Sequence, residues 1–453
     1  METIMKINDF LNGIVWGPPM LILLVGTGLF LSIKTGFFSI RKLGYILKNT
    51  LLKMFSKESK GEGEVTAFQA VATALAATVG TGNIAGVATA IASGGPGAVL
   101  WMWIAAILGM TTKFSEVVLA VRFREKTDDG RYVGGPMYYI KNGLGWKWLS
   151  VLFAVFGALA AFGIGNMVQS NSVAASLKAT FNINPLYTGI VLAVITALVI
   201  VGGIKRIGAF TEKLVPFMAA IYIIGGLVII LLNIAHIPAA FGLIFASAFS
   251  GKAAIGGFAG ATVAQAIRFG VARGVFTNEA GLGSAPIAHA AATTDHPVRQ
   301  GLWGVFEVFA DTIVICSITA LSILTSGVWE SGATGAELTT AAFDATLPGG
   351  GYIVSIGIVL FAFSTIIGWE YYGERCLEYL AGPKSIMFYK ILWIPFVVIG
   401  AVGGLESIWA LADTLNGLMA IPNLIGIVAL SGTIFALTKE FFSKEFSKKE
   451  KNN

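Results

Sequence analysis

Apolar runs of about twenty residues recur along the whole of this 453-residue chain, and they restrict its possible folds more than any other feature. A helix of that length crosses a hydrocarbon core about 30 Å thick. Hydrophobic residues make up 55% of the chain and charged residues only 12%, about half the charged share of a soluble domain. The sequence therefore predicts an all-α protein that crosses a membrane many times.

The hydropathy pattern predicts about eleven transmembrane helices. Their ranges are 14–33, 66–93, 97–121, 149–177, 185–204, 214–234, 257–291, 298–326, 352–380, 386–403 and 406–437. The first run has no basic leader, so we expect a retained helix and not a cleaved signal. The last run contains Pro422 and is either kinked or divided into two elements. The segments 238–250 and 327–351, between runs, are candidates for gating half-helices.

The basic residues predict the orientation of these helices. One alternating set of loops, including the tail, carries 25 of the 31 Lys and Arg residues, whereas the opposite set carries only Lys6, Lys178 and Lys252. Cytoplasmic loops hold the basic excess in membrane proteins, so we expect the C-terminus inside the cell and the N-terminus outside, in the plasma membrane. The net charge of +6 is then an orientation signal with lipid head groups as a secondary partner, and it does not indicate nucleic acid.

Several other functions lack a signal in the sequence. The two cysteines, Cys316 and Cys376, are far apart, and the three histidines have no ligand spacing, so neither a disulfide framework nor a metal cluster is expected. No catalytic pairing of serine and histidine appears, and the glycine motif "GTGNIAG" follows no strand, which argues against a dinucleotide site. We therefore expect no enzyme and no organic cofactor.

Two of the predicted helices are interrupted by glycines with polar neighbours. The second contains "TVGTGNIAG" at 78–86, and the seventh contains "FTNEAGLGS" at 276–284. Irregular backbone in a membrane survives only where it is buried or lines a cavity. The two helices run in opposite directions and lie five helices apart, as in an inverted repeat with a substrate site near the midplane. The alternative is close helix packing through small residues, but the polar neighbours favour a binding site.

Around these residues the sequence resembles the alanine or glycine:cation symporter family. The stretches that carry the resemblance are "TVGTGNIAGVATAI", "GGPGAVLWMW", "GMTTKFSE", "GGPMYYI", "RGVFTNEAGLGSAP" and "FSTIIGWEYYGERC". The resemblance implies a leucine-transporter-like fold, with ten core helices in two inverted halves after one additional helix. We accordingly expect an N-terminal helix and basic loop over 1–65, a first repeat over 66–235, a second repeat over 236–438 and a basic cytoplasmic tail over 439–453.

A zwitterionic substrate needs donors for its carboxylate and acceptors for its ammonium group. We expect the unwound amides of Gly80, Thr81, Gly82 and Asn83 to receive the carboxylate, because a helix N-terminus favours anions. Carbonyl groups near Thr78, Phe276 and Thr277 are expected to receive the ammonium group. The remaining candidates for the substrate pocket are Gln169, Gly281 and Trp369.

Trp369 would cap the pocket and restrict it to small side chains, or it would serve as an interfacial anchor. The resemblance also implies a sodium site, formed by the hydroxyls of Ser364 and Thr365 with the carbonyls of Ala76, Val79 and Phe361. The alternative for these two hydroxyls is a hydrogen bond to their own helix.

Charged residues inside the apolar runs need partners. Lys113 and Glu116 are three residues apart on one helix, which predicts a structural ion pair. Arg268, Arg273 and Glu279 fall in the seventh helix, where a salt bridge or a gate is expected. Glu279 is also the best-placed titratable group for a proton-coupled carrier.

These observations together predict a secondary transporter that carries alanine or glycine inward with a cation, most simply Na⁺, by alternating access. Two alternatives remain open: a proton-coupled symporter of another small amino acid, and a channel.

Overall fold

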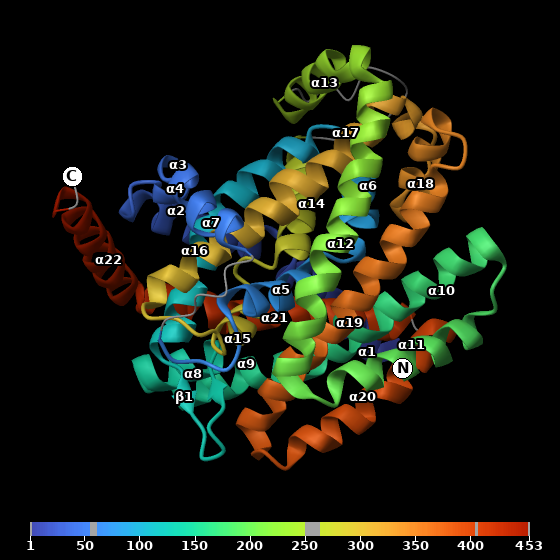
Figure 1. Ribbon diagram of the computed structural model, residues 1–453. Coiled ribbons are helices and arrows are strands. Elements are labelled where there is room, and N and C mark those ends of the chain that lie inside the picture. Colours follow the sequence, from blue (N-terminus) through green and yellow to red (C-terminus); the bar gives the residue numbers. More distant parts are fainter. Residues whose placement is uncertain (1, 55–60, 250–262, 404–405, 452–453) are drawn as a thin grey trace.

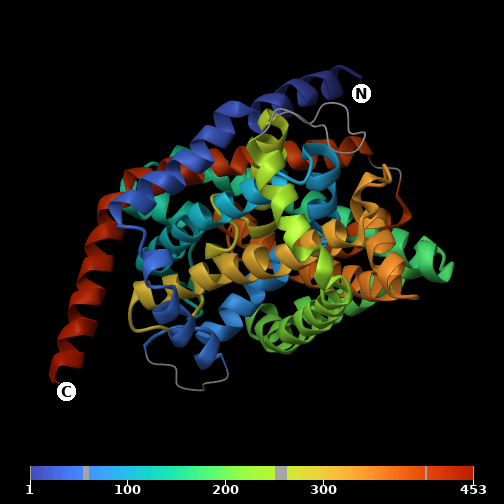
Figure 2. The ribbon, with the colours of Figure 1, turned by 90° about the horizontal axis from the view of Figure 1, so that it is seen from above.

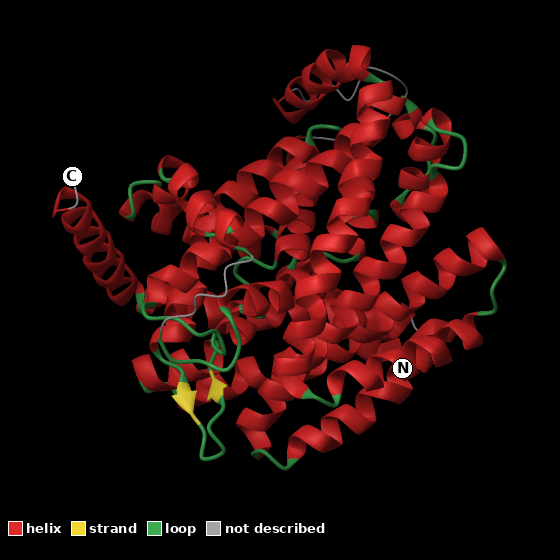
Figure 3. Ribbon diagram, in the orientation of Figure 1, coloured by secondary structure: helices red, strands yellow, loops and turns green. Residues whose placement is uncertain are grey.

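The computed structural model describes residues 2–54, 61–249, 263–403 and 406–451. The described chain is helical almost throughout (Figure 3), which confirms the predicted all-α class. The exception is a short antiparallel pair, β1 (Glu125–Lys126) and β2 (Tyr132–Val133), in which Glu125 lies opposite Val133. This hairpin projects at one end of the helical bundle (Figure 1).

The first half of the chain forms the additional N-terminal helices and the first five predicted transmembrane helices that follow them. Its elements are α1 (Glu2–Val15), α2 (Pro18–Lys34), α3 (Phe38–Arg41), α4 (Leu43–Asn49), η1 (Leu51–Lys53), α5 (Ala67–Thr78), η2 (Thr81–Asn83), α6 (Ala85–Gly94), α7 (Ala98–Arg122), α8 (Pro136–Tyr139), η3 (Ile140–Leu144), α9 (Lys147–Ala160), η4 (Ala161–Met167), α10 (Val168–Phe181), α11 (Pro185–Ile200) and α12 (Gly203–Leu232).

The second half repeats this helical character. Its elements are η5 (Ile234–His236), α13 (Ile237–Phe249), α14 (Val263–Asn278), α15 (Pro286–His289), α16 (Pro297–Val308), η6 (Phe309–Cys316), α17 (Ser317–Ser326), η7 (Val328–Glu330), α18 (Gly335–Thr346), α19 (Gly351–Ala381), α20 (Ser385–Val402), α21 (Glu406–Ala429) and α22 (Ser431–Lys451). The predicted start of the seventh transmembrane helix, at residue 257, lies outside the described residues.

Eight helices in the described ranges are long and apolar enough to cross a membrane. Of the other predicted crossings, the second is divided into two shorter apolar helices and the fifth is the shorter helix α11. The second predicted crossing consists of α5 and α6 with η2 between them, so the predicted interruption is confirmed. The last predicted crossing is two elements: α21 ends at Ala429, and α22 extends away from the bundle (Figures 1 and 2).

Local sequence explains where α5 begins and ends. Thr66 caps its first turn, because its hydroxyl accepts a hydrogen bond from the Gln69 amide and the Gln69 side chain accepts one from the Thr66 amide, both at 3.1 Å. The helix ends where Val79 leaves helical dihedral angles (φ −77°, ψ 89°) and Gly80 becomes extended.

The two interrupted elements lie inside the bundle, where other helices cover them. The helix α5 packs against α12 and α19, and α14 packs against α7 and α6. The added helix α1 lies along α21 at the edge of the bundle (Figure 2). Irregular backbone in α5–α6 and after α14 is thus surrounded by protein.

Candidate functional site

The first break, between α5 and α6, places unpaired amides at its centre. The Gly80 amide donates to the Asn83 side chain at 2.9 Å, and the Asn83 amide donates to the Gly80 carbonyl at 3.3 Å. Within the described part of the chain, the amides of Thr81 and Gly82 have no hydrogen-bond acceptor. These two are therefore the donors that the break can offer to an anion.

The Asn83 side chain fixes the break to a neighbouring helix. Its amide group donates to a carboxylate oxygen of Asp311 at 2.5 Å, and Asp311 is fully buried in η6. The hydroxyl of Thr319 donates to the Asn83 carbonyl at 2.8 Å. Asn83 consequently connects the unwound segment to η6 and α17, and its side chain points to Asp311.

The second break follows Asn278, where three residues adopt left-handed backbone angles. Glu279, Gly281 and Gly283 have φ values of 56°, 92° and 84°. Such angles strain most residues but suit glycine. The chain does not resume a helix until α15, so residues 279–285 form an irregular strap through the bundle.

Residues from three distant motifs hold this strap. Glu116 of α7 accepts the Gly281 amide at 3.0 Å, and Asn423 of α21 donates to the Gly281 carbonyl at 2.9 Å and to Glu116 at 2.6 Å. The Tyr139 hydroxyl of α8 in turn donates to Asn423. The amide and the carbonyl of Gly281 are thereby both hydrogen-bonded, as buried polar groups generally are.

A small cavity of about 20 Å³ lies between the two breaks. Its lining residues come from α5, the first break, η4, α10, α14, the strap, α19 and α21: Ala77, Thr78, Gly80, Gly82, Ile164, Gln169, Phe276, Glu279, Leu282, Thr365, Trp369 and Asn416. Polar groups occupy one part of the wall, and Ile164, Leu282 and Trp369 supply an apolar part. The cavity is small and has both a polar and an apolar part of its wall.

The sequence-predicted residues are distributed unevenly around this cavity. Thr78, Gly80, Gly82, Gln169, Phe276 and Trp369 line it, whereas Thr81, Asn83, Thr277 and Gly281 lie behind the lining. Sequence reasoning did not select Ile164, Leu282 or Asn416. The signal that points to Ile164 is the cluster of glycines and Asn166 in η4, a π-helical segment, since such segments concentrate at functional sites.

Glu279 lines the cavity with a fully enclosed carboxylate. One of its oxygens accepts the Trp369 indole N–H at 2.8 Å, and the other accepts the Ser284 hydroxyl at 2.5 Å. The Trp369 ring reaches this position because Gly165, which packs against it, has no side chain in the way. Trp369 is buried, so the structure gives it a place in the pocket wall and not at the surface.

Hydrogen bonds join four residues of the predicted cation site, Ser364, Thr365, Ala76 and Phe361. The Ser364 hydroxyl crosses from α19 to α5 and donates to the Ala76 carbonyl at 3.0 Å, as well as to the Phe361 carbonyl at 2.8 Å. The Thr365 hydroxyl donates to the Phe361 carbonyl at 3.0 Å, a bond within its own helix. All of these residues, and Val79, are buried. Neutral hydroxyl and carbonyl oxygens of this kind suit a hard cation such as Na⁺.

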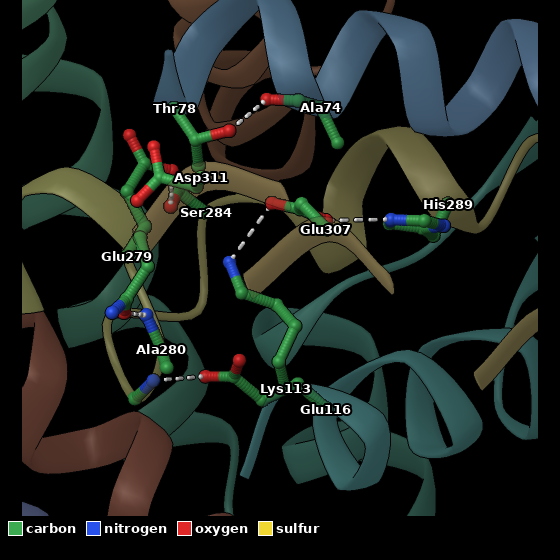
Figure 4. Close-up of polar contacts among 12 residues, drawn as sticks. Ala74, Thr78, Lys113, Glu116, Glu279, Ala280, Ser284, His289, Glu307 and Asp311 are labelled. Atoms are coloured by element: carbon green, nitrogen blue, oxygen red, sulfur yellow. Dashed lines mark hydrogen bonds and ion pairs between the residues drawn. The ribbon is translucent and has the colours of Figure 1, made fainter. Parts of the chain in front are cut away.

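Lys113 does not pair with Glu116, and this prediction was wrong. Its ammonium group contacts Glu307 of α16 at 3.2 Å, and the second oxygen of Glu307 contacts the His289 ring at 3.0 Å (Figure 4). Glu116 instead holds the Gly281 amide. The i,i+3 spacing allowed the predicted pair. Instead, Lys113 pairs with a carboxylate of another helix, and Glu116 accepts a backbone amide that would otherwise be buried without a hydrogen bond.

Arg124, at the end of the bundle that carries the hairpin, ties together the segments that flank both breaks. Its guanidinium donates to the carbonyls of Ala290, Ala292 and Glu62 at 3.0, 2.7 and 2.7 Å. In the nearby hairpin, hydrogen bonds from Thr127 and Arg131 lower the pKa of Asp129 to about 2. Arg124 thus holds segments from distant parts of the chain together on this face of the protein.

Known proteins resemble this chain over its full length. The model of the sodium:alanine symporter family matches residues 1–453. The sodium/alanine symporter AgcS of Methanococcus maripaludis is 53% identical, with 100% of each chain covered. The probable sodium/glutamine symporter GlnT of Bacillus subtilis is 39% identical, covering 95% of this chain and 89% of the relative. Among solved structures, MhsT in complex with L-phenylalanine has a TM-score of 0.61 at 13% identity, covering 82% of this chain and 89% of that one, which shows the leucine-transporter-like fold.

Proposed function

Since the chain belongs to the sodium:alanine symporter family, we propose that it moves alanine or glycine into the cell together with Na⁺ by alternating access. The observation that supports this most is a small closed cavity between two interrupted helices, with unpaired amides and a carboxylate in or beside its wall and a cluster of neutral oxygens next to it. The protein is a multi-pass membrane transporter and not an enzyme. Substrate, ion and direction are the proposed parts.

In this proposal the substrate spans the cavity from one break to the other. The amides of Thr81 and Gly82, with the positive N-terminal end of α6 behind them, receive the carboxylate. The Glu279 carboxylate and the last carbonyls of α5 receive the ammonium group. Ile164 and Leu282 contact a methyl side chain. Glycine and alanine differ by one carbon, worth only about 1–3 kcal/mol, so the same pocket accepts both.

Thr365 is the residue through which ion and substrate are coupled. It lines the substrate cavity and also belongs to the predicted cation site. An ion that orders the Thr365 hydroxyl and the end of α5 would thus prepare the substrate pocket. By linkage, the substrate then strengthens ion binding by the same factor. In this arrangement ion binding and substrate binding are coupled directly, because the two sites share Thr365.

A larger cavity supports a route to this site. It has a volume of about 1000 Å³, lies between α6, α10, α18 and α19, and reaches Thr81. The Thr81 hydroxyl, on the wall of the larger cavity, donates at 3.2 Å to the side chain of Gln169, which lines the substrate cavity. The opposite face is held by Arg124. With basic loops inside the cell, the larger cavity faces outward, and Na⁺ and substrate would enter there.

Uptake into proteoliposomes tests the proposal. Labelled alanine should accumulate when an inward Na⁺ gradient is imposed, saturate with substrate, and stop when the gradient is collapsed. Accumulation driven by a proton gradient without Na⁺ would instead favour the second candidate, a proton-coupled symporter, for which the buried Glu279 carboxylate in the cavity is the specific observation. Uptake that does not saturate and ignores both gradients would indicate a channel.

A further inference from the structure

A groove of about 390 Å³ lies at the edge of the bundle, where the end of α2 and the short helix α3 meet the tail helix α22. The Phe30 and Phe435 rings are 6.2 Å apart, so α2 and α22 lie side by side at this point (Figure 2). Two kinds of side chain dominate its wall: three lysines, Lys34, Lys42 and Lys439, and three phenylalanines, Phe38, Phe435 and Phe442. We call it the basic groove.

The lysines of the basic groove come from three separate segments. Lys34 is the last residue of α2, Lys42 joins α3 to α4, and Lys439 lies on α22. Lys34 and Lys439 are exposed, and neither has an acid partner in the described ranges. The Lys42 ammonium group lies 4.8 Å from the centre of the Phe442 ring. Among the described residues no carboxylate lines this groove, so its charge is entirely positive.

The nearby acids of α22 are engaged with other partners. Two acids of this helix have side chains that the structure describes, Glu440 and Glu445. Glu440 pairs with Lys444 at 2.6 Å. Glu445 contacts Arg299 of α16 and accepts the Tyr45 hydroxyl, both at 3.3 Å. The lysines of the basic groove therefore keep an excess of positive charge, which an anion can match.

The phenylalanines make the remaining wall apolar and connect it to the bundle. Phe38 is buried, and its ring centre lies 4.5 Å from that of Phe114 on α7 and 6.2 Å from that of Phe442. An inorganic anion would gain nothing from such a wall. A lipid would, because the carbon atoms next to its phosphate lose contact with water there.

The basic groove also lies at the level where a lipid head group is expected. The helix α2 belongs to the candidate membrane span Lys6–Lys34, and Lys34 is the last residue of that span. Lysines at the end of a membrane helix extend toward the head groups. By the predicted orientation this end is cytoplasmic, and the cytoplasmic leaflet carries anionic lipids.

We propose that the basic groove is a binding site for one anionic phospholipid of the cytoplasmic leaflet. The lipid phosphate binds Lys34, Lys42 and Lys439, and the glycerol and the first carbons of an acyl chain contact the phenylalanines. The bound lipid thus lies between α22 and the helices α2 and α3. The basic groove shares no lining residue with the substrate cavity, so this inference goes beyond the proposed function and does not depend on it.

Native mass spectrometry of the delipidated full-length protein in detergent, titrated with phosphatidylglycerol, tests this site. The wild type should bind a first molecule clearly more tightly than any later one, and phosphatidylcholine should show no such preference. Lys34→Gln and Lys439→Gln should each weaken the first molecule about fivefold, and the double variant about thirtyfold, since each lysine near an anionic head group contributes about that factor. Lys48→Gln, at an exposed lysine of α4 outside the groove, is the matched control and should bind like the wild type.

A second variant tests the space and not the charge. Ser443 lines the basic groove, so Ser443→Trp adds a large ring there and keeps all three lysines. It should abolish the tight first molecule while the unfolding temperature in detergent stays that of the wild type.

Three results would overturn the site. The first is a wild type that binds phosphatidylglycerol no better than phosphatidylcholine. The second is a double variant, Lys34→Gln with Lys439→Gln, that retains the affinity of the wild type. The third is equal affinity for glycerol 3-phosphate, which would show an anion site without a lipid. Each of them leaves Na⁺-driven alanine uptake unaffected, so a failure of this site and a failure of the proposed function are distinguishable.

Discussion

Replacing Thr365 by alanine tests the coupling of ion and substrate most directly. The Thr365 hydroxyl makes one hydrogen bond, to the Phe361 carbonyl of its own helix at 3.0 Å. Its removal therefore breaks no contact between helices, and the fold should tolerate it. Ser364 differs, because its hydroxyl joins α19 to the Ala76 carbonyl of α5 at 3.0 Å. Thr365→Ala thus isolates the ligand role from the structural role.

The expected magnitude follows from the loss of one oxygen from a small ion. Interactions of a neutral group with a charged one contribute about 1.5–3 kcal/mol, and about 1.4 kcal/mol corresponds to a tenfold change in affinity. The Na⁺ concentration for half-maximal uptake should therefore rise about tenfold to a hundredfold. Maximal uptake at saturating Na⁺ should change much less, because the other lining residues of the cavity are intact.

The assay is initial uptake of labelled alanine into proteoliposomes over a range of external Na⁺. Thr365→Ser keeps the hydroxyl and is the matched control, which should remain within about threefold of the wild type. If Thr365→Ala shows the Na⁺ dependence of the wild type, then the hydroxyl serves only its own helix and Thr365 is not an ion ligand. Coupling would then have to act through other residues.

Three further results are expected. Gly80→Ala would place a methyl group 2.7 Å from the Thr365 hydroxyl, so the affinity for alanine should fall about tenfold or more. In the control Gly86→Ala the new methyl group meets nothing within 4 Å, so this variant should bind alanine normally, and equal affinities of the two variants would contradict the close fit at Gly80. Lys113→Met should leave the Glu307 carboxylate buried without its cation, a loss of about 3–5 kcal/mol, and lower the unfolding temperature in detergent, which the double change with Glu307→Gln should partly restore; an unchanged unfolding temperature would refute a structural role. Arg124→Gln should loosen the backbone segments that Arg124 holds together, and should therefore increase the alkylation of cysteines introduced beneath them. The same cysteines in the wild-type background are the control, and identical alkylation would mean that other groups hold these segments.

The all-α class and the place of the first break were predictable because both depend on local sequence. A run of apolar residues fixes a membrane helix by itself. The first break contains its own support, since the Gly80 amide is satisfied by Asn83 three residues later. Two glycines and an asparagine within an apolar segment were therefore sufficient to predict an interruption of the helix.

The partners of buried charges were not predictable from spacing. Lys113 and Glu116 share a helix, yet Lys113 pairs with Glu307, nearly two hundred residues later in the chain. Glu279 belongs to the cavity wall because the left-handed backbone at this residue and its contacts with Ser284 and Trp369 direct it there. A single sequence gives the types of the charged residues, but it does not give the tertiary arrangement that determines which acid pairs with which base.

The two breaks differ in how they are held, and this difference bears on which one moves. The second break is fixed by Glu116, Asn423 and Tyr139, which belong to three other elements. The amides of the first break at Thr81 and Gly82 have no partner in the described chain. A substrate carboxylate that binds them therefore adds the hydrogen bonds that the first break lacks, while the second break gains few. Binding energy is thus delivered mainly to α5 and α6, and these are the helices whose position should follow occupancy of the site.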